Sequence, residues 1–379
     1  MTWRNDLHLN EAVVGSLTAV AEQYLHLAGD RSNDDFLMGR DADDLVEHIL
    51  TPRVVERDWR PRGRLSANGR CHLMPTADGQ WVALNLARPG DVDVFRAVLL
   101  GTSTATDRSD LECFEGAVAS WSAEDLVDAT HDLGVPLSRV GEVEWGGSLA
   151  ELPIRHQWGH DDQLSDRGGS RSPGPPVKVL DLSTLWAGPL CSRLLLAAGC
   201  LVTTVESIHR PDPTRWSHPL FFADLHRGKE HVRLDFARER RRLEALIEQS
   251  DVVIVNSRPA ALRRLGLESG HFVDGVRLWV SITGYGGDNP EDVDRGASLR
   301  VGFGDDCAVA GGLVNWSADG PGFLGDAVAD PATGLVAATA ILSELGSGVV
   351  HRSGHMRVAL AECANWVLRG GGVHCHRRD

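Results

Sequence analysis

The chain has 379 residues, of which 42% are hydrophobic and 24% are charged, and these proportions are typical of a soluble globular protein with two or three domains. The formal net charge of −15 argues against a nucleic-acid-binding surface, although local arginines and helix N-termini can still hold phosphates on an acidic protein. No apolar run is long enough for a membrane span, and acids interrupt the first residues where a secretory signal needs an apolar stretch. We therefore expect a cytoplasmic protein.

The first elements in the chain predict a small α+β domain over residues 1–154. Apolar residues at helical spacing predict a helix over 10–28. Two apolar runs joined by the turn Ala77-Asp78-Gly79 predict strands over 70–76 and 80–86. The next elements predicted are helices near 90–100, 110–120 and 123–133, and a short strand near 136–144.

Residues 155–176 are rich in Gly, Pro, Ser and charge and lack apolar periodicity, which predicts a linker between domains. From 177 to 379 the pattern changes to strands alternating with helices. The predicted strands lie at 177–182, 201–207, 232–236, 251–256 and 277–284, and helices follow near 189–199 and 237–249. This alternation predicts a Rossmann-like parallel sheet with helices on both faces, and hence an α/β fold class.

Ligands in such sheets bind at the carboxyl ends of the strands, so the segments of interest are 183–189, 206–215, 256–259 and 283–290. The sequence contains no GxGxxG fingerprint, Walker loop, GxSxG elbow or HExxH motif. The seven cysteines form no CxxC pair or zinc spacing, so we expect reduced thiols. From the residues alone the chain is an α/β ligand-binding protein, most simply an enzyme.

A set of motifs in the second half resembles the family III CoA-transferases, the group that includes formyl-CoA and carnitine CoA-transferases and α-methylacyl-CoA racemases. The motifs occur in the family's order at 179–207, 225–236, 250–267, 280–286 and 323–335. Segments 78–99 and 121–143 resemble the family's small domain, which normally follows the large one. The resemblance therefore implies a circularly permuted arrangement, in which the small domain comes first.

The resemblance implies that Asp326, within Leu324-Gly325-Asp326, is the nucleophile of a CoA transfer. In the family this carboxylate attacks the acyl-CoA carbonyl, and a mixed anhydride and then an aspartyl-CoA thioester follow. The alternative is that Asp326 only shapes a loop before a helix that begins near Asp330, which we interpret as a helix-capping residue. The neighbouring acids Asp305 and Asp306 are candidates for acid–base work or for a solvated turn.

Family correspondence also implies a binding site for coenzyme A, the substrate thioester. For Trp186 packing in the core is an equal alternative. For any arginine a surface salt bridge is the alternative to a phosphate contact, and Arg215 is a weaker candidate of the same kind. The implied CoA-binding residues are Leu185, Trp186, Ala187, Asn256, Ser257, Arg258, Arg264 and Arg295.

The resemblance implies CoA transfer between an acyl-CoA and a free carboxylic acid by an interlocked homodimer, without a metal or a redox cofactor. From the net charge and the lack of a long apolar run we expect no nucleic-acid or membrane partner. One alternative is racemisation of a 2-methylacyl-CoA, which needs two bases. Ala297 and Ser298 stand where the racemases carry a histidine, and this counts against it. The other alternative is a non-catalytic CoA-thioester-binding homologue, because Gly370-Gly371-Gly372 is not placed where the family's glycine-rich loop would be.

Overall fold

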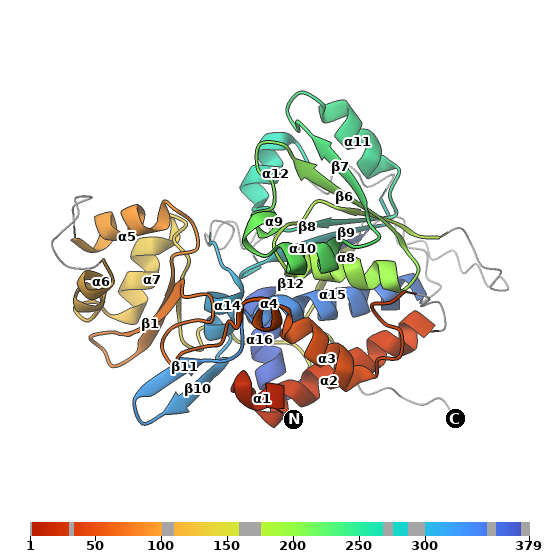
Figure 1. Cartoon of the computed structure of the whole chain (residues 1–379). Helices are drawn as coiled ribbons and strands as arrows, with labels where there is room; N and C mark the ends of the chain where they lie inside the picture. Colours follow the sequence, from red (N-terminus) through yellow and green to blue (C-terminus); the bar gives the residue numbers. More distant parts are fainter. Residues whose placement is uncertain are drawn as a thin grey trace.

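The computed structural model describes residues 2–29, 34–100, 110–158, 176–267, 276–286, 300–346 and 354–372. A large layered part built on one sheet lies beside a smaller part that contains α5, α6, α7 and β1 (Figure 1). Within the described ranges, no helix is both long and apolar enough to cross a membrane.

A seven-stranded sheet organises the large part, in the order β4-β12-β9-β8-β5-β6-β7. All neighbouring strands pair in parallel except β4, which pairs antiparallel with β12. Numbered along the chain from β5, the parallel strands follow the order 3-2-1-4-5-6, which is the order of a doubly wound nucleotide-binding sheet. The predicted α/β fold class is confirmed. The strands are β5 (Lys178–Asp181), β6 (Leu201–Ser207), β7 (Glu230–Leu234), β8 (Val252–Val255), β9 (Leu278–Thr283), β12 (Gly354–Ala359) and β4 (Arg155–Trp158).

Helices bury both faces of this sheet, and the strand sequences show why. In the apolar run Val252–Val255, successive side chains point to opposite faces, so Val252 and Ile254 join one hydrophobic core while Val253 and Val255 join another. The second core is closed by α11 (Arg240–Glu248) and α12 (Pro259–Leu265). The first core is closed by α8 (Ala187–Ala197), α15 (Ala329–Gly346) and α16 (Leu360–Leu368).

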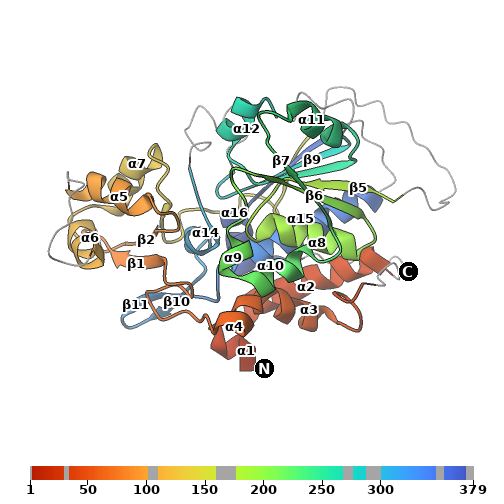
Figure 2. The same ribbon diagram turned by 45° about the horizontal axis from the view of Figure 1, so that its top comes forward.

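The N-terminal helices α2 (Glu11–Ala28) and α3 (Ala42–Leu50) belong to this first core, and α2 confirms the helix predicted over 10–28. Figures 1 and 2 both show α2 lying along α15, on the side away from the sheet. The Tyr24 hydroxyl donates to the Leu194 carbonyl oxygen at 2.8 Å. The buried Arg193 guanidinium pairs with the Asp34 carboxylate. Because α15 is covered on nearly all sides, its sequence is apolar around most of its circumference.

The smaller part contains an antiparallel sheet of β1 (Cys71–Pro75), β2 (Trp81–Asn85) and β3 (Leu137–Arg139), so the two predicted strands are confirmed and the third is shorter than predicted. The helices α5 (Asp91–Leu100), α6 (Asp110–Val118) and α7 (Ala123–His131) confirm the three predicted helices. These helices pack on one face of the sheet around Phe95 and Phe114. The other face shares a core with α14 (Gly304–Ala310) and the hairpin β10 (Val314–Ser317) and β11 (Gly320–Phe323).

Residues 155–158 and 42–57 are among the segments that depart from the sequence prediction. The expected linker begins as structure, since Arg155–Trp158 form the edge strand β4, and residues 159–175 lie outside the described residues. Residues 42–57, for which no element was predicted, form α3 and α4 (Pro52–Arg57). The division into domains at 154 and 177 stays a prediction. In the structure, α2 and α3 share one hydrophobic core with the large sheet.

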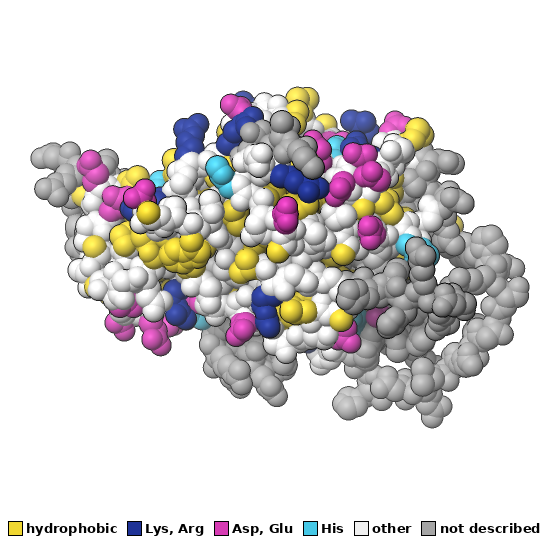
Figure 3. Space-filling view, turned by 90° about the horizontal axis from the view of Figure 1, so that it is seen from below, with side chains coloured by type: hydrophobic (Ala, Val, Ile, Leu, Met, Phe, Trp, Pro, Cys, Tyr) yellow, Lys and Arg dark blue, Asp and Glu magenta, His cyan; other side chains and the backbone are white. Residues whose placement is uncertain are grey.

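The helix α4 is held against α9 (Thr214–Ser217) and α10 (Pro219–His226) by polar contacts. Arg57 Nη2 donates to the Ser217 carbonyl oxygen at 3.0 Å, and the Phe221 amide donates to Glu56 Oε2 at 3.0 Å. On the face drawn in Figure 3, basic and acidic side chains are interspersed among hydrophobic ones.

Candidate functional site

Asp326 lies in a tight loop between β11 and α15, and the residues on either side of Asp326 determine the shape of this loop. Gly325 and Ala327 both have left-handed backbone conformations, with φ of 57° and 48°. A non-glycine residue in this region is strained, and such residues concentrate at functional sites. The Gly325 amide donates to the Leu7 carbonyl oxygen at 2.8 Å, and the Ala327 amide donates to Asp305 Oδ1 at 3.0 Å. The loop is therefore held from the N-terminal segment on one side and from α14 on the other.

The Asp326 carboxylate is 1% exposed and forms an ion pair with the guanidinium of Arg53. Arg53 Nε donates to Asp326 Oδ2 at 2.7 Å, and Arg53 Nη2 donates to Oδ1 at 2.6 Å, which is a bidentate pair. Arg53 itself is 12% exposed. Its position on α4 follows from Pro52, which begins the helix and is accommodated in the first turn.

Three aromatic rings surround this guanidinium. The Arg53 Cζ atom lies 4.5 Å from the ring centroid of Trp186, 5.4 Å from that of Trp59 and 5.9 Å from that of Phe221. Cations are attracted to aromatic faces at these distances. His218 packs its ring edge-on against Trp59 with centroids 4.4 Å apart, and burial lowers the pKa of His218 to about 4. The Arg53–Asp326 pair thus lies in an apolar box that a neutral imidazole helps to close.

Three buried acids, Asp305, Asp306 and Asp326, gather at this point with the partly buried Asp330, and burial raises the pKa of each. Burial raises the pKa of Asp326, and the charge and hydrogen bonds of Arg53 offset part of that rise. Burial and the neighbouring Asp326 charge raise the pKa of Asp305, and burial raises the pKa of Asp330 to about 7 and that of Asp306 to about 6. Asp326 is the member of this group that pairs with a guanidinium, which favours its ionised form.

The carboxyl ends of β5 and β8 lie side by side where the strand order reverses, which is the place where doubly wound sheets bind ligands. Asn256 connects the segments that follow β8 and β5. Its Oδ1 accepts from the Thr184 amide at 3.2 Å, and its Nδ2 donates to the Thr184 carbonyl oxygen at 2.7 Å. Leu185 is left-handed with φ of 75°, and its amide donates to Asp212 Oδ2 at 2.8 Å. Burial raises the pKa of Asp212.

The segment 185–187 connects this point to the Asp326 loop. Trp186 is 2% exposed and lies in the large core, with its ring centroid 4.9 Å from that of Phe221. Ala187 begins α8, and its backbone offsets part of the rise in the pKa of Asp330, which lies in the first turn of α15. The predicted residues Leu185, Trp186 and Ala187 therefore lie between the carboxyl end of β5 and the predicted nucleophile.

The predicted arginines are arranged at the surface beyond β8. Arg258 and Arg264 are exposed, as is Ser257. Partial desolvation of the guanidinium, followed by the positive charges of Arg88, Arg210 and Arg264, lowers the pKa of Arg258.

Arg258 also reaches the smaller part of the molecule, because its Nη1 lies 3.3 Å from where a Cβ on Gly134 would stand. Arg215 instead pairs with Glu206 at 3.0 Å, and Arg295, with Ala297 and Ser298, lies outside the described residues.

Sequence reasoning missed two groups at this site. Arg53 has no motif around it, and only Pro52 gives a signal, which marks a helix start and not a role. Lys229 is buried beside the end of β5, where its Nζ donates to Ser192 Oγ at 2.7 Å and to the Pro189 carbonyl oxygen at 2.8 Å. Burial lowers the pKa of Lys229 to about 8, and Asp181 offsets part of the effect. Lys229 is one of two lysines in an arginine-rich chain, and this rarity was a usable signal for the position.

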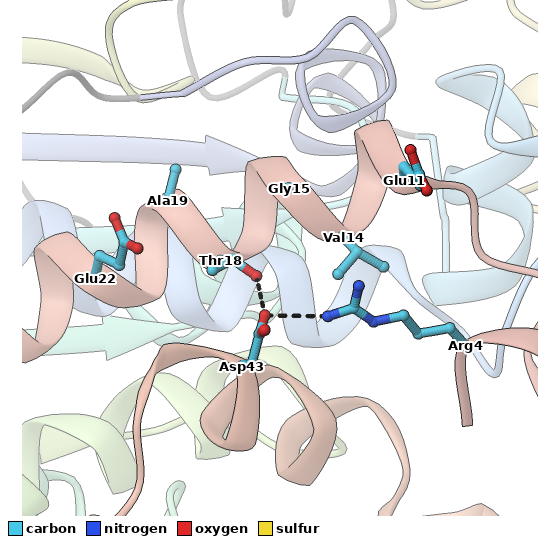
Figure 4. A pocket seen from close by; sticks show the side chains of 8 residues that line it. All are labelled: Arg4, Glu11, Val14, Gly15, Thr18, Ala19, Glu22 and Asp43. Atoms are coloured by element: carbon cyan, nitrogen blue, oxygen red, sulfur yellow. Dashed lines mark hydrogen bonds and ion pairs between the residues drawn. The ribbon is translucent and has the colours of Figure 1, made fainter. Parts of the chain in front are cut away.

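Other features of the described residues lie apart from this site. A hollow of about 340 Å³ lies between α1 (Thr2–Asp6), α2 and α3. Figure 4 shows that its arginine, Arg4, points to Asp43, which also accepts from Thr18. Across the described ranges, no group of three or more His, Cys, Asp and Glu side chains is arranged to hold a metal ion.

Residues 176–370 match the sequence profile described as CoA-transferase family III. The match covers the doubly wound strands, the carboxyl ends of β5 and β8, and the Asp326 loop. The chain belongs to this family.

The relatives and structures that resemble this family III chain do so over about half of it. An acyl-CoA transferase from Fusarium pseudograminearum is 32% identical over 193 residues, which are 45% of this chain and 41% of that protein. The succinyl-CoA:glutarate CoA-transferase of Mus musculus is 31% identical over 191 residues, covering 46% of this chain and 42% of its own. A crystal structure of a CAIB/BAIF family protein from Brucella suis aligns with a TM-score of 0.44 at 28% identity, covering 51% of this chain and 54% of that one.

This family III chain spans about two fifths of the length of these two curated relatives. Asp326 lies inside the matched residues, whereas Arg53 lies outside them. The order of the two domains relative to other members stays a prediction.

Proposed function

We propose that the protein transfers coenzyme A between an acyl-CoA thioester and a free carboxylic acid, with Asp326 as the nucleophile. The observation that carries this proposal is the Asp326 carboxylate itself, which lies in a strained loop inside the family-matched residues and is paired with Arg53. A nucleophilic carboxylate must be ionised, and the guanidinium favours that form against the effect of burial.

The chemistry follows from a carboxylate nucleophile. An Asp326 oxygen attacks the thioester carbonyl carbon, the C–S bond breaks with its electron pair on sulfur, and a mixed anhydride remains on the enzyme. The CoA thiolate attacks the Asp326 carbonyl carbon, the donor carboxylate leaves, and an aspartyl-CoA thioester is formed. The acceptor carboxylate then repeats these two steps in reverse and regenerates Asp326.

The acids beside Asp326 suit this sequence because they ionise less readily than exposed aspartates, so that Asp305 and Asp330 are partly neutral near pH 7. Burial raises the pKa of Asp330 to about 7 and raises that of Asp305 as well. Neutral carboxyl groups can donate hydrogen bonds to an oxyanion that develops nearby.

For coenzyme A we propose the carboxyl ends of β5 and β8, lined by Leu185, Trp186, Ala187 and Asn256. The diphosphate and the 3′-phosphate would be bound by Arg258 and Arg264, to which the neighbouring Arg88 and Arg210 add positive charge. We also propose Ser257 and Arg295 as CoA-binding residues, on the basis of the family correspondence. The proposal includes a homodimer and a cytoplasmic location. No metal or redox cofactor enters these steps.

The test is to trap the covalent intermediate. The protein is incubated with acetyl-CoA and then with hydroxylamine or borohydride, and the adduct is mapped by mass spectrometry. We expect modification at Asp326, its loss in Asp326→Asn, and its retention in Asp319→Asn, which changes an exposed acid on the β10–β11 turn.

Two other results would contradict the proposal. CoA binding with no adduct would favour the non-catalytic CoA-binding homologue. Exchange of the α-proton of a 2-methylacyl-CoA with solvent, again with no adduct, would favour racemisation.

A further inference from the structure

The Arg53 guanidinium is a nearly buried cation whose anionic partner changes charge during the proposed reaction. It is 12% exposed, lies against the rings of Trp59, Trp186 and Phe221, and gives two hydrogen bonds to Asp326. The acids Asp305 and Asp330 also lie within its field, but burial favours their neutral forms. In the resting protein, Asp326 is thus the negative charge that compensates Arg53.

Acylation removes that compensation. An aspartyl anhydride and an aspartyl thioester carry no charge, so each covalent intermediate leaves Arg53 facing a neutral carbonyl group. A buried cation without a partner is strongly unfavourable, because desolvation is no longer offset by an ion pair. The aromatic faces around it attract a cation but supply no hydrogen-bond acceptors in the plane of the guanidinium.

The reaction itself releases the missing anion. When the CoA thiolate attacks the Asp326 carbonyl carbon of the anhydride, the C–O bond to the donor acyl group breaks and its electron pair leaves on the donor as a carboxylate. The negative charge thus passes from sulfur to a carboxylate oxygen at the place where Arg53 has lost its partner. The acceptor acid brings an identical charged group to the same place for the return steps.

We propose that Arg53 is the carboxylate-binding residue of the site and exchanges partners during turnover, pairing with Asp326 in the resting enzyme and with the substrate carboxylate in the aspartyl-thioester intermediate. This inference rests on the proposed function. Its planar fork matches a substrate carboxylate as well as it matches Asp326. The rings of Trp59, Trp186 and Phe221 would lie beside the carbon chain, so the substrate class is a monocarboxylic acid that is apolar next to its carboxylate.

A binding experiment tests this exchange without depending on catalysis. Asp326→Asn removes the resting anion while keeping the shape of the side chain, so Arg53 becomes available to a free carboxylate. Calorimetric titration with butyrate should show binding at least about tenfold tighter to Asp326→Asn than to the wild-type protein. The double variant Asp326→Asn/Arg53→Met should lose this binding, and Asp326→Asn/Arg53→Lys, which keeps the charge but not the fork, should retain part of it. Arg57→Met in the Asp326→Asn background is the control on the same helix and should bind butyrate as Asp326→Asn does.

Equal butyrate affinity for the wild-type protein and Asp326→Asn would overturn the inference. So would undiminished affinity in the Arg53→Met double variant. If that variant does not fold, the Arg53→Lys variant decides, because unchanged butyrate affinity there would equally exclude a forked contact. A different measurement tests the proposed function itself: if that function is wrong, no Asp326 adduct is trapped in the wild-type protein.

Discussion

Asp326 and Arg53 meet in one ion pair but lie on regions of the chain that are held in different ways. The Asp326 loop lies within residues 176–370, between β11 and the buried helix α15, and backbone amides fix its left-handed turns. Arg53 lies on the six-residue helix α4, outside the family match, and side-chain contacts to α9 and α10 hold that helix. The proposed nucleophile, in the family-matched region, is thus paired with a residue on a short helix that lies outside that region.

The ion pair provides the largest expected effect. Arg53→Met leaves an unpaired buried carboxylate, so we expect the free energy of unfolding to fall by about 3–5 kcal/mol. The second change in Arg53→Met/Asp326→Leu removes that charge, and most of the loss should be recovered. Urea unfolding of the wild-type protein, both single variants and the double variant measures the coupling.

The control for this cycle is Arg57→Met, on the same helix, whose exposed side chain makes one hydrogen bond to a carbonyl oxygen. It should change the free energy of unfolding by less than about 1 kcal/mol. If the double variant were as destabilised as the sum of the two single variants, the pair would not be coupled, and the comparison between the two regions would lose its basis.

Close packing within the family-matched region predicts the next effect. A Cβ on Gly304 would lie 2.2 Å from Asp330 Oδ2, 2.6 Å from Ala327 Cβ and 2.7 Å from the carbonyl oxygen of Ala327, the residue that follows Asp326. We expect Gly304→Ala to destabilise the protein by about 1–3 kcal/mol, because the backbone of the loop must move. We also expect it to slow formation of the Asp326 adduct. Thermal unfolding and the trapping experiment measure the two effects.

Gly116→Ala is the matched control for Gly304→Ala. Gly116 lies in α6, and no atom stands within 4 Å of where its Cβ would lie, so alanine should be neutral or stabilise by roughly 0.5–1 kcal/mol. Equal effects at the two glycines would mean that the Asp326 loop can be displaced at little cost in stability, which would contradict close packing as the reason for its shape.

The sequence predicted the sheet better than the site, and the reason is physical. Short apolar runs such as Val252–Val255 have to be buried on both sides, so they predict parallel strands and helices on both faces. Asp326 could be selected because flanking motifs resemble a family. Arg53 could not, because it is 273 residues away in the chain and its role depends on a tertiary contact.

The backbone of the site was equally hidden from sequence reasoning. Leu185 and Ala327 adopt left-handed conformations that glycine normally supplies, so no turn signal marks them. Hydrogen bonds from their amides to Asp212 and Asp305 stabilise these conformations, and both acids come from distant segments. The choice that the sequence left open for Trp186, between a ligand wall and the core, likewise depends on packing against Phe221.

The smallest expected effect concerns the pH dependence of stability. Burial raises the pKa of Asp330 to about 7, so the folded protein binds a proton there that the unfolded chain releases near pH 4. Between those values the unfolded state binds fewer protons, and the contribution of Asp330 to stability falls as pH rises from about 4 through about 7. Asp330→Asn removes this dependence, so the variant should gain at least about 1 kcal/mol relative to the wild-type protein between pH 5 and pH 8 in urea unfolding. Asp319→Asn, at an exposed position, should show no such gain, and parallel profiles for Asp330→Asn and the wild-type protein would contradict a neutral Asp330 beside the charged Asp326.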